Sequence, residues 1–225
     1  MKKYITELIG TFFLVYAVGH NVIGGNPVAP IGIGLMLAVM IYAGGHISGA
    51  HFNPAVTVAV WLRGKCDTKD VVPYILCQVV GAVLAALVVS WLRGKAAAPG
   101  DFELSKVILA EVVGTFALAW VVLNVATTKA NANNSFYGAA IGLTVTAGAF
   151  AVGGISGAAF NPAVATGAVA MNILKGSHIW AYWVFCIAGS AAAQSTLAIA
   201  GVAGFGTVGL ETGVVSLQRN ALLQF

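Results

Sequence analysis

Two asparagines occupy matching positions of a repeated segment, and their side-chain amides can donate and accept hydrogen bonds. Each lies in a ten-residue segment, ISGAHFNPAV at 47–56 and ISGAAFNPAV at 155–164, and nine of the ten positions are identical. The amide N–H groups of both asparagines are hydrogen-bond donors. A duplicated segment of this kind indicates two matching half-sites that face each other, which is typical of a transport pore and not of an enzyme. The residues at the centre of the two copies are Asn53, Pro54, Ala55, Asn161, Pro162 and Ala163.

Nothing else in the sequence predicts catalysis. The few ionisable groups show no arrangement of nucleophile, base and orienting group. The three cysteines, Cys66, Cys77 and Cys186, are scattered without the spacing of metal ligands. We therefore expect no enzymatic activity, no cofactor and no bound metal.

The composition is that of a polytopic membrane protein. Hydrophobic residues make up 59% of the 225 residues and charged residues only 8%, whereas soluble domains carry about 25% charged residues. The formal net charge of +4 is modest and is explained by Lys and Arg in loops, so we expect no nucleic-acid partner. The expected surroundings are a lipid bilayer.

Six apolar stretches reach or approach the length of about 20 residues that a spanning helix needs. They are residues 4–23, 28–43, 71–92, 107–126, 136–152 and 179–200. Two further apolar stretches, 54–62 and 162–171, reach only about 15 Å, half of the hydrocarbon core. We therefore predict an all-α membrane protein with six transmembrane helices and two re-entrant half-helices.

The duplication extends over most of the chain. Tyr74 recurs as Tyr182 at the same offset that separates Asn53 from Asn161. Glu7 recurs as Glu111 at a slightly shorter offset, because the second copy has four extra residues in one loop. The assigned repeats are about 1–92 and 104–203, within a single transmembrane channel domain, 1–225. Three spans in each copy require opposite orientations, so we predict an inverted repeat whose half-helices enter from opposite faces.

The distribution of positive charge predicts the orientation in the membrane. With the amino terminus inside, seven basic residues are cytoplasmic and four are outside, which agrees with the excess of Lys and Arg in cytoplasmic loops. The seven are Lys2, Lys3, Arg63, Lys65, Lys69, Lys129 and Arg219, and the four are Arg93, Lys95, Lys106 and Lys175. We expect an integral protein of a bacterial inner (plasma) membrane with both termini cytoplasmic.

The Asn-Pro-Ala sequences also predict the electrostatics at the centre of the pore. Asn is a good N-cap and Pro suits the first helical position, so each begins a half-helix whose positive end carries about half a charge. At about 4 Å and an effective dielectric of about 20, each end repels a cation by about 2 kcal/mol. Neutral polar solutes are not repelled, so we expect ions and protons to be excluded.

Irregular backbone precedes each half-helix. Such backbone survives at membrane depth only where it lines a cavity or is buried in protein. The residues whose backbone we expect to line the pore are Gly49, Ala50, His51, Gly157 and Ala159.

Taken together, these motifs resemble the aquaporin family. The resemblance rests on the paired Asn-Pro-Ala sequences, HISGAHFNPAV at 46–56, QVVG at 78–81, and the glutamates Glu7 and Glu111. It covers nearly the whole chain and implies a homotetramer with one pore in each subunit, which conducts water or small neutral solutes passively. It also implies that Asn53 and Asn161 donate hydrogen bonds to the passing molecule.

One position departs from the family pattern. Members of the family usually have Arg directly after the second Asn-Pro-Ala, where this chain has Val164. The resemblance places the four residues of the selectivity filter at Ile33, Ala149, Ala158 and Val164. All four are apolar and two are small, which predicts a wide filter that admits glycerol, urea, ammonia or neutral metalloid acids. The pair Tyr182-Trp183 favours water alone by the same resemblance, which opposes this prediction.

Glu7 and Glu111 are ionisable groups in apolar helices, so a proton relay is one interpretation of them. By the resemblance they are instead structural, and each accepts hydrogen bonds from the irregular loop of its own repeat. His46 and His51 flank the first irregular loop, and a pH gate at either remains an alternative because histidine titrates near neutrality.

Two other classes of function stay open. A secondary transporter of a small neutral solute can share inverted repeats and broken helices, but it needs a site for a coupling ion, and no acidic residue lies near either Asn-Pro-Ala. A structural membrane protein with a closed pore is the other alternative.

Overall fold

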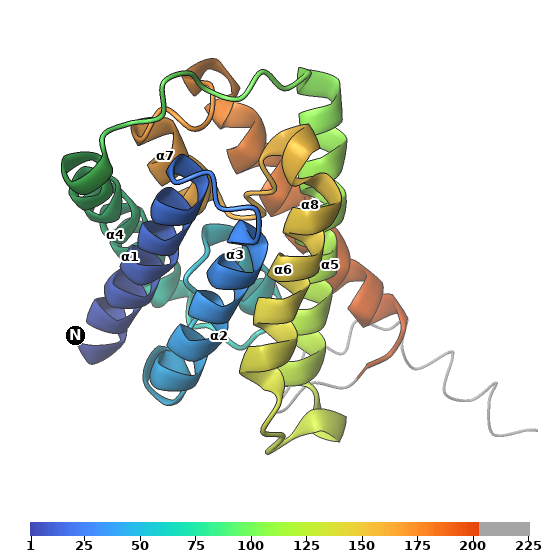
Figure 1. Cartoon of the computed structure of the whole chain (residues 1–225). Coiled ribbons are helices and arrows are strands. Elements are labelled where there is room, and N and C mark those ends of the chain that lie inside the picture. Colours follow the sequence, from blue (N-terminus) through green and yellow to red (C-terminus); the bar gives the residue numbers. More distant parts are fainter. Residues whose placement is uncertain (203–225) are drawn as a thin grey trace, which may run out of the picture.

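The computed structural model describes residues 1–202 and contains only helices there (Figure 1). The long helices are α1 (Lys2–Ile23), α2 (Ala29–Ser48), α4 (Thr68–Arg93), α5 (Leu104–Thr127), α6 (Tyr137–Ser156) and α8 (Ile179–Ile199). The short ones are α3 (Pro54–Leu62), α7 (Pro162–Ala170) and the 3-10 turns η1 (Lys129–Asn131) and η2 (Gly176–His178). Arg219, residue 203 at the end of the second repeat, and most of the tail at 201–225 lie outside the described residues.

The six long helices are long and apolar enough to cross a membrane, which confirms the predicted fold class. The prediction was wrong at the ends of α2 and α6, which continue to Ser48 and Ser156, beyond the expected ends at residues 43 and 152. Both helices stop where the next residue is a glycine in the left-handed region, Gly49 at φ 85° and Gly157 at φ 83°. Glycine adopts the left-handed conformation at little steric cost, so Gly49 and Gly157 can serve as the C-caps that end these helices.

α2 and α6 run antiparallel and pack against each other (Figure 1). A Cβ on Gly34 would lie 2.4 Å from the carbonyl oxygen of Gly142, and a Cβ on Gly142 would lie 2.3 Å from that of Gly34. The two glycines are equivalent positions of the two repeats. Their mutual contact places the axis of the inverted repeat between them, and only glycine allows the backbones to come this close.

Each half-helix packs against the last long helix of the other half: α3 against α8, and α7 against α4. α3 follows a loop from the face that carries the N-terminus, here called the N-terminal face, and α7 enters from the opposite face. Their first turns contact each other in the interior. This exchange joins the two halves into a single bundle around the loops that precede the half-helices.

Candidate functional site: a central cavity

A cavity of about 870 Å³ passes between the two halves of the bundle. Its wall is mostly apolar, and both asparagines of the duplicated segment lie on it. The residues predicted from the sequence that line it are Ile33, Gly49, Ala50, His51, Asn53, Ala149, Gly157, Ala158, Ala159, Asn161 and Val164. Those that lie behind the wall are Glu7, Pro54, Ala55, Glu111, Pro162 and Ala163. The cavity thus brings together the predicted residues of both repeats.

The two asparagine amides are fixed by matching hydrogen bonds. Each side-chain oxygen caps its own half-helix by accepting from the second and third backbone N–H groups of that half-helix. Asn53 Nδ2 donates to the carbonyl oxygen of Phe160 at 2.8 Å, and Asn161 Nδ2 donates to that of Phe52 at 2.9 Å. An amide carries two N–H groups, so one on each asparagine remains available to the cavity.

The carboxylate of Glu7 holds the loop before α3. It accepts from Ser48 Oγ at 2.7 Å, from the backbone N–H of His51 at 3.0 Å and from that of Phe52 at 2.7 Å. Ala50 and Phe52 have φ values of 51° and 49°, a region that non-glycine residues avoid. The hydrogen bonds to Glu7, which is fully buried, offset this strain and satisfy N–H groups that have no helical partner.

Glu111 does the same in the second half. It accepts from Ser156 Oγ at 2.7 Å, from the N–H of Ala159 at 3.1 Å and from that of Phe160 at 2.7 Å. The equivalent φ values are 48° at Ala158 and 47° at Phe160. The two carboxylates accept from the same three donors, a serine hydroxyl and two backbone N–H groups, and so support the two loops, and neither lines the cavity.

The first half adds a polar network that the second half lacks. Gln78 Nε2 donates to the Glu7 carboxylate at 2.8 Å and to Thr57 Oγ1 at 3.0 Å. At the positions of the second half that are equivalent to His51, Thr57 and Gln78 stand Ala159, Ala165 and Cys186. The Cys186 thiol lies 3.4 Å from the Glu111 carboxylate.

The network also assigns the tautomer of the one histidine on the described cavity wall. Thr57 uses its hydroxyl proton on the carbonyl oxygen of Asn53 at 3.0 Å and accepts from Gln78, so the contact at 3.2 Å with His51 Nδ1 requires Nδ1 to be the donor. The other ring nitrogen of neutral His51, Nε2, is therefore an acceptor.

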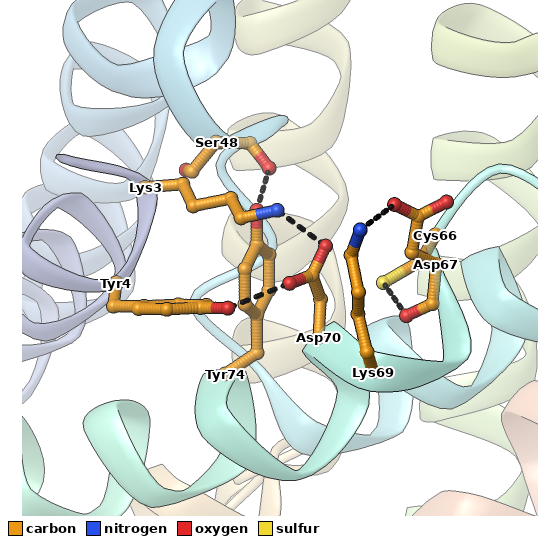
Figure 2. A network of polar contacts seen from close by, with 8 residues as sticks. All are labelled: Lys3, Tyr4, Ser48, Cys66, Asp67, Lys69, Asp70 and Tyr74. Atoms are coloured by element: carbon orange, nitrogen blue, oxygen red, sulfur yellow. Dashed lines mark hydrogen bonds and ion pairs between the residues drawn. The ribbon is translucent and has the colours of Figure 1, made fainter. Parts of the chain in front are cut away.

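Several supporting residues were not assigned a role from the sequence. Tyr74 donates its hydroxyl to the carbonyl oxygen of Ser48 at 2.7 Å, next to the contacts of Lys3 and Tyr4 with Asp70, as Figure 2 shows. Its counterpart Tyr182 donates to the carbonyl oxygen of Ser156, so this tyrosine ties α8 to the second loop. Recurrence at the offset between the two repeats was the signal that could have identified both tyrosines and both serines.

The two mouths of the cavity differ in charge. At the N-terminal face, Lys65 lines the cavity, and Arg63 donates to Thr127 Oγ1 at 3.3 Å and to the carbonyl oxygen of Val202 at 2.9 Å. Burial lowers the pKa of Arg63, and burial with the nearby charges of Arg63 and Lys129 lowers the pKa of Lys65.

At the opposite face, the connection 94–103 crosses the chain that follows α7. The backbone N–H groups of Ala96 and Gly100 donate to carbonyl oxygens there at 3.0 Å and 2.9 Å. Lys175 pairs with Asp101, and its hydrogen bond lowers the pKa of that carboxyl below its usual value. The wall at this mouth is apolar and includes Phe102 and Leu174.

Comparison with known proteins finds relatives of this chain by sequence. A sequence profile described as Major intrinsic protein matches residues 1–197. The chain is 38% identical over 198 residues to a putative aquaporin, NIP4-1, of Arabidopsis thaliana, a match that covers 81% of this chain and 69% of the plant protein. It is 35% identical over 195 residues to the glycerol uptake facilitator protein-like 6 of Lactiplantibacillus plantarum, covering 81% and 90%.

A solved structure shares the fold. The X-ray structure of the aquaglyceroporin from Plasmodium falciparum superposes with a TM-score of 0.76 at 22% sequence identity, over 87% of this chain and 94% of that one. At this identity the likeness concerns the arrangement of the helices alone.

Proposed function

The chain belongs to the major intrinsic protein family, and from that premise we propose that it is a passive transmembrane channel for water and other small uncharged solutes. The observation that carries the proposal is the pair of asparagine amides on the wall of one cavity, each with an N–H group left over after its loop contact. A solute that crosses the apolar wall meets these two amides as donors at the centre, which suits a neutral polar molecule.

Ions are excluded by the same centre. α3 and α7 both begin at the asparagines, so their positive ends face the solute path, and together they repel a cation by about 4 kcal/mol. This is a factor of about a thousand against a cation. The capping oxygens of Asn53 and Asn161 are turned to the helices, which leaves donors, and not acceptors, for the solute.

The four residues Ile33, Ala149, Ala158 and Val164, here called the outer ring, form the filter toward the opposite face. All four line the cavity, and none can donate a side-chain hydrogen bond or carry a charge. Without an Arg at position 164, the outer ring has no charge or hydrogen-bond donor with which to recognise a solute, so we propose that it is wide enough for solutes larger than water. We therefore include glycerol, urea, ammonia and neutral metalloid acids among the candidate solutes.

The distribution of basic residues supports an orientation of the protein in the membrane. The N-terminal face carries six of the basic residues of the described chain, Lys2, Lys3, Arg63, Lys65, Lys69 and Lys129, against four at the opposite face. We place this face in the cytoplasm, and we place the protein as a homotetramer in a bacterial inner (plasma) membrane. The repeats are about 1–92 and 104–203 of one channel domain.

A channel is favoured over the two alternatives. Among the described residues that line the cavity, none is Asp or Glu, so a transporter would lack a carboxylate for its coupling ion. A closed structural protein does not explain a continuous cavity that retains two unpaired amide N–H groups. An enzyme is disfavoured because the described cavity wall carries no nucleophile with a base and an orienting group.

Osmotic flux in reconstituted vesicles tests the channel. Vesicles that contain the purified protein are expected to shrink faster than protein-free vesicles after an osmotic step, with a low activation energy and a rate that does not saturate. Equal rates contradict the proposal when circular dichroism shows that the protein is helical and flotation of the vesicles shows that it is inserted. A saturable flux driven by an ion gradient favours the transporter instead.

The outer ring is tested by restoring the family residue. The Val164→Arg variant is expected to retain water flux and to lose flux of glycerol and urea, because Arg adds bulk and a charge to a ring of apolar residues. The Val164→Leu variant adds bulk alone and serves as the control for charge. If the unmodified protein already admits water only, another element narrows the path.

A further inference from the structure

The inverted repeat places a second ring of residues on the cavity, between the asparagines and the N-terminal face. The offset between the two repeats maps the outer ring onto Ile141, Ile41, Ala50 and Val56, here called the inner ring. All four residues line the same cavity as the outer ring and all four are buried. The path through the protein therefore passes two equivalent rings and not one.

The two rings lie at different depths. Ile33 and Ile41 are eight residues apart on α2, which corresponds to about 12 Å along the helix axis. α6 runs antiparallel to α2 across the Gly34–Gly142 crossing, so it contributes Ala149 to the outer ring and Ile141 to the inner ring. A solute meets the rings one after the other, on either side of the asparagine amides.

Three of the four positions are identical between the rings, and the fourth is not. Each ring has one Ile, one Ala and one Val in common, while position 41 is Ile and its equivalent 149 is Ala. The Ile side chain has three more carbon atoms than Ala. Ile41 is only 3% exposed, whereas Ala149 is half-buried, so the larger side chain fills its part of the wall.

The backbone of the inner ring is also held more firmly. Ala50 belongs to the loop that Glu7 supports, and the hydrogen bonds among Gln78, Thr57 and His51 tie that loop to α3 and α4. The outer ring takes Ala158 from a loop that lacks this network, because Ala159 replaces His51 there. A ring fixed in this way resists widening when a solute passes.

We propose that the inner ring, and not the outer ring at the family's filter position, sets the size limit of this channel, and that Ile41 is the residue that determines it. The proposal rests on the channel function proposed above. The inner ring has no polar side chain, so it passes compact solutes that need few hydrogen bonds, and it retards polyols such as glycerol relative to water.

Exchange of the residues at positions 41 and 149 tests the proposal. Water, urea, glycerol and erythritol fluxes are measured in vesicles for the Ile41→Ala and Ala149→Ile variants and for the variant that carries both changes. One methylene in an apolar site is worth about tenfold or more in discrimination, so Ile41→Ala is expected to raise the glycerol-to-water flux ratio at least about tenfold. The double variant is expected to return the ratio toward that of the unmodified protein, because the Ala149→Ile change rebuilds a narrow ring on the outer side.

The controls separate this proposal from the channel function and from loss of folding. Val39→Ala removes similar bulk from α2 at a side chain that is 50% exposed on the outer surface, and it is expected to leave all fluxes unchanged. Ile41→Val, which removes a single methyl group, gives a graded result if Ile41→Ala does not insert. No water flux in the unmodified protein overturns the channel itself. Normal water flux with an unchanged solute limit in Ile41→Ala or Ile41→Val overturns only the role of the inner ring.

Discussion

The two halves of this protein hold their half-helices by the same set of hydrogen bonds, and the first half adds a further polar network. In both, a buried glutamate accepts from a serine hydroxyl and two backbone N–H groups, a tyrosine holds the same serine carbonyl, and an asparagine caps the half-helix and reaches across to the other loop. Only the first half adds Gln78, Thr57 and His51. The shared contacts are therefore the minimum that holds a half-helix at the centre, and the additional ones stiffen one side of the path.

Loss of a loop-supporting carboxylate is expected to have the largest effect on either half. Glu7→Ala leaves a serine hydroxyl, two backbone N–H groups and Gln78 Nε2 without this acceptor, and Glu111→Ala leaves a serine hydroxyl, two backbone N–H groups and the Cys186 thiol without theirs. At about 1–3 kcal/mol for each lost partner, both variants are expected to lose most folded protein. The fall is expected to be larger for Glu7, because Gln78 is a stronger donor than the thiol of Cys186. Thermal unfolding in detergent measures this, with the exposed Glu103→Ala as control. Two unaffected variants would show that the carboxylates are not supports.

Charge at the centre tests whether the two half-helices contribute equally to ion exclusion. Asn53→Asp and Asn161→Asp each place a carboxylate beside one positive helix end, and the double variant brings enough charge to cancel a barrier of about 4 kcal/mol. We expect a small cation or proton leak in each single variant, of equal size, and a large one in the double variant. A pH-sensitive dye in the vesicles measures the leak, with the loop variant Asn26→Asp as control. Unchanged exclusion in the inserted double variant contradicts the dipole account.

The additional network of the first half is tested by replacing Gln78 with cysteine, the residue at the equivalent position of the second half. Gln78→Cys removes the donors to Glu7 and Thr57 and is expected to lower the free energy of unfolding by about 1–3 kcal/mol. Cys186→Ala, the matched change in the second half, removes one sulfur atom and is expected to cost about 1 kcal/mol. Equal losses would mean that the network adds no stability, and the proposed stiffness of the inner ring would lose its support.

The smallest effect is expected at the mouths. Arg63→Ala removes a partly buried contact with Thr127 and Val202 and is expected to lower the melting temperature more than Lys175→Ala, which breaks an exposed pair. Because Lys175 lowers the pKa of Asp101, the pair contributes stability above the usual carboxyl pKa of about 4. The contribution is lost as pH falls through the lowered pKa.

Melting curves of the unmodified protein and Lys175→Ala between pH 7 and pH 3 provide the measurement. A difference that is small at pH 7 and vanishes at the acid end is the expected outcome. A difference that grows on acidification would show that the carboxylate of Asp101 is not the partner that matters.

The sequence by itself determined the class of fold, because its signals are local or repeated. Six apolar stretches predict six spans by length alone, and the two copies of Asn-Pro-Ala predict both half-helices to within one residue. The supporting role of Glu7 and Glu111 was predicted from the resemblance to the family, and the recurrence of Glu7 as Glu111 agreed with it. The ends of α2 and α6 could not be predicted from the sequence, because the glycine pairs 44–45 and 153–154 weaken the helical signal. Packing in the bundle stabilises those last turns.

What only the tertiary structure decided are the relations across the inverted repeat. Which carbonyl each asparagine reaches, which tautomer His51 adopts, and which side chains share a depth on the cavity wall all depend on contacts between residues far apart in the sequence or on networks of several partners. The offset between the repeats relates Ile41 to Ala149, but only the cavity in the structure shows that both line the path. Ile33, Leu37 and Ile41 follow one another on one face of α2, and the packing of the bundle turns that face toward the cavity.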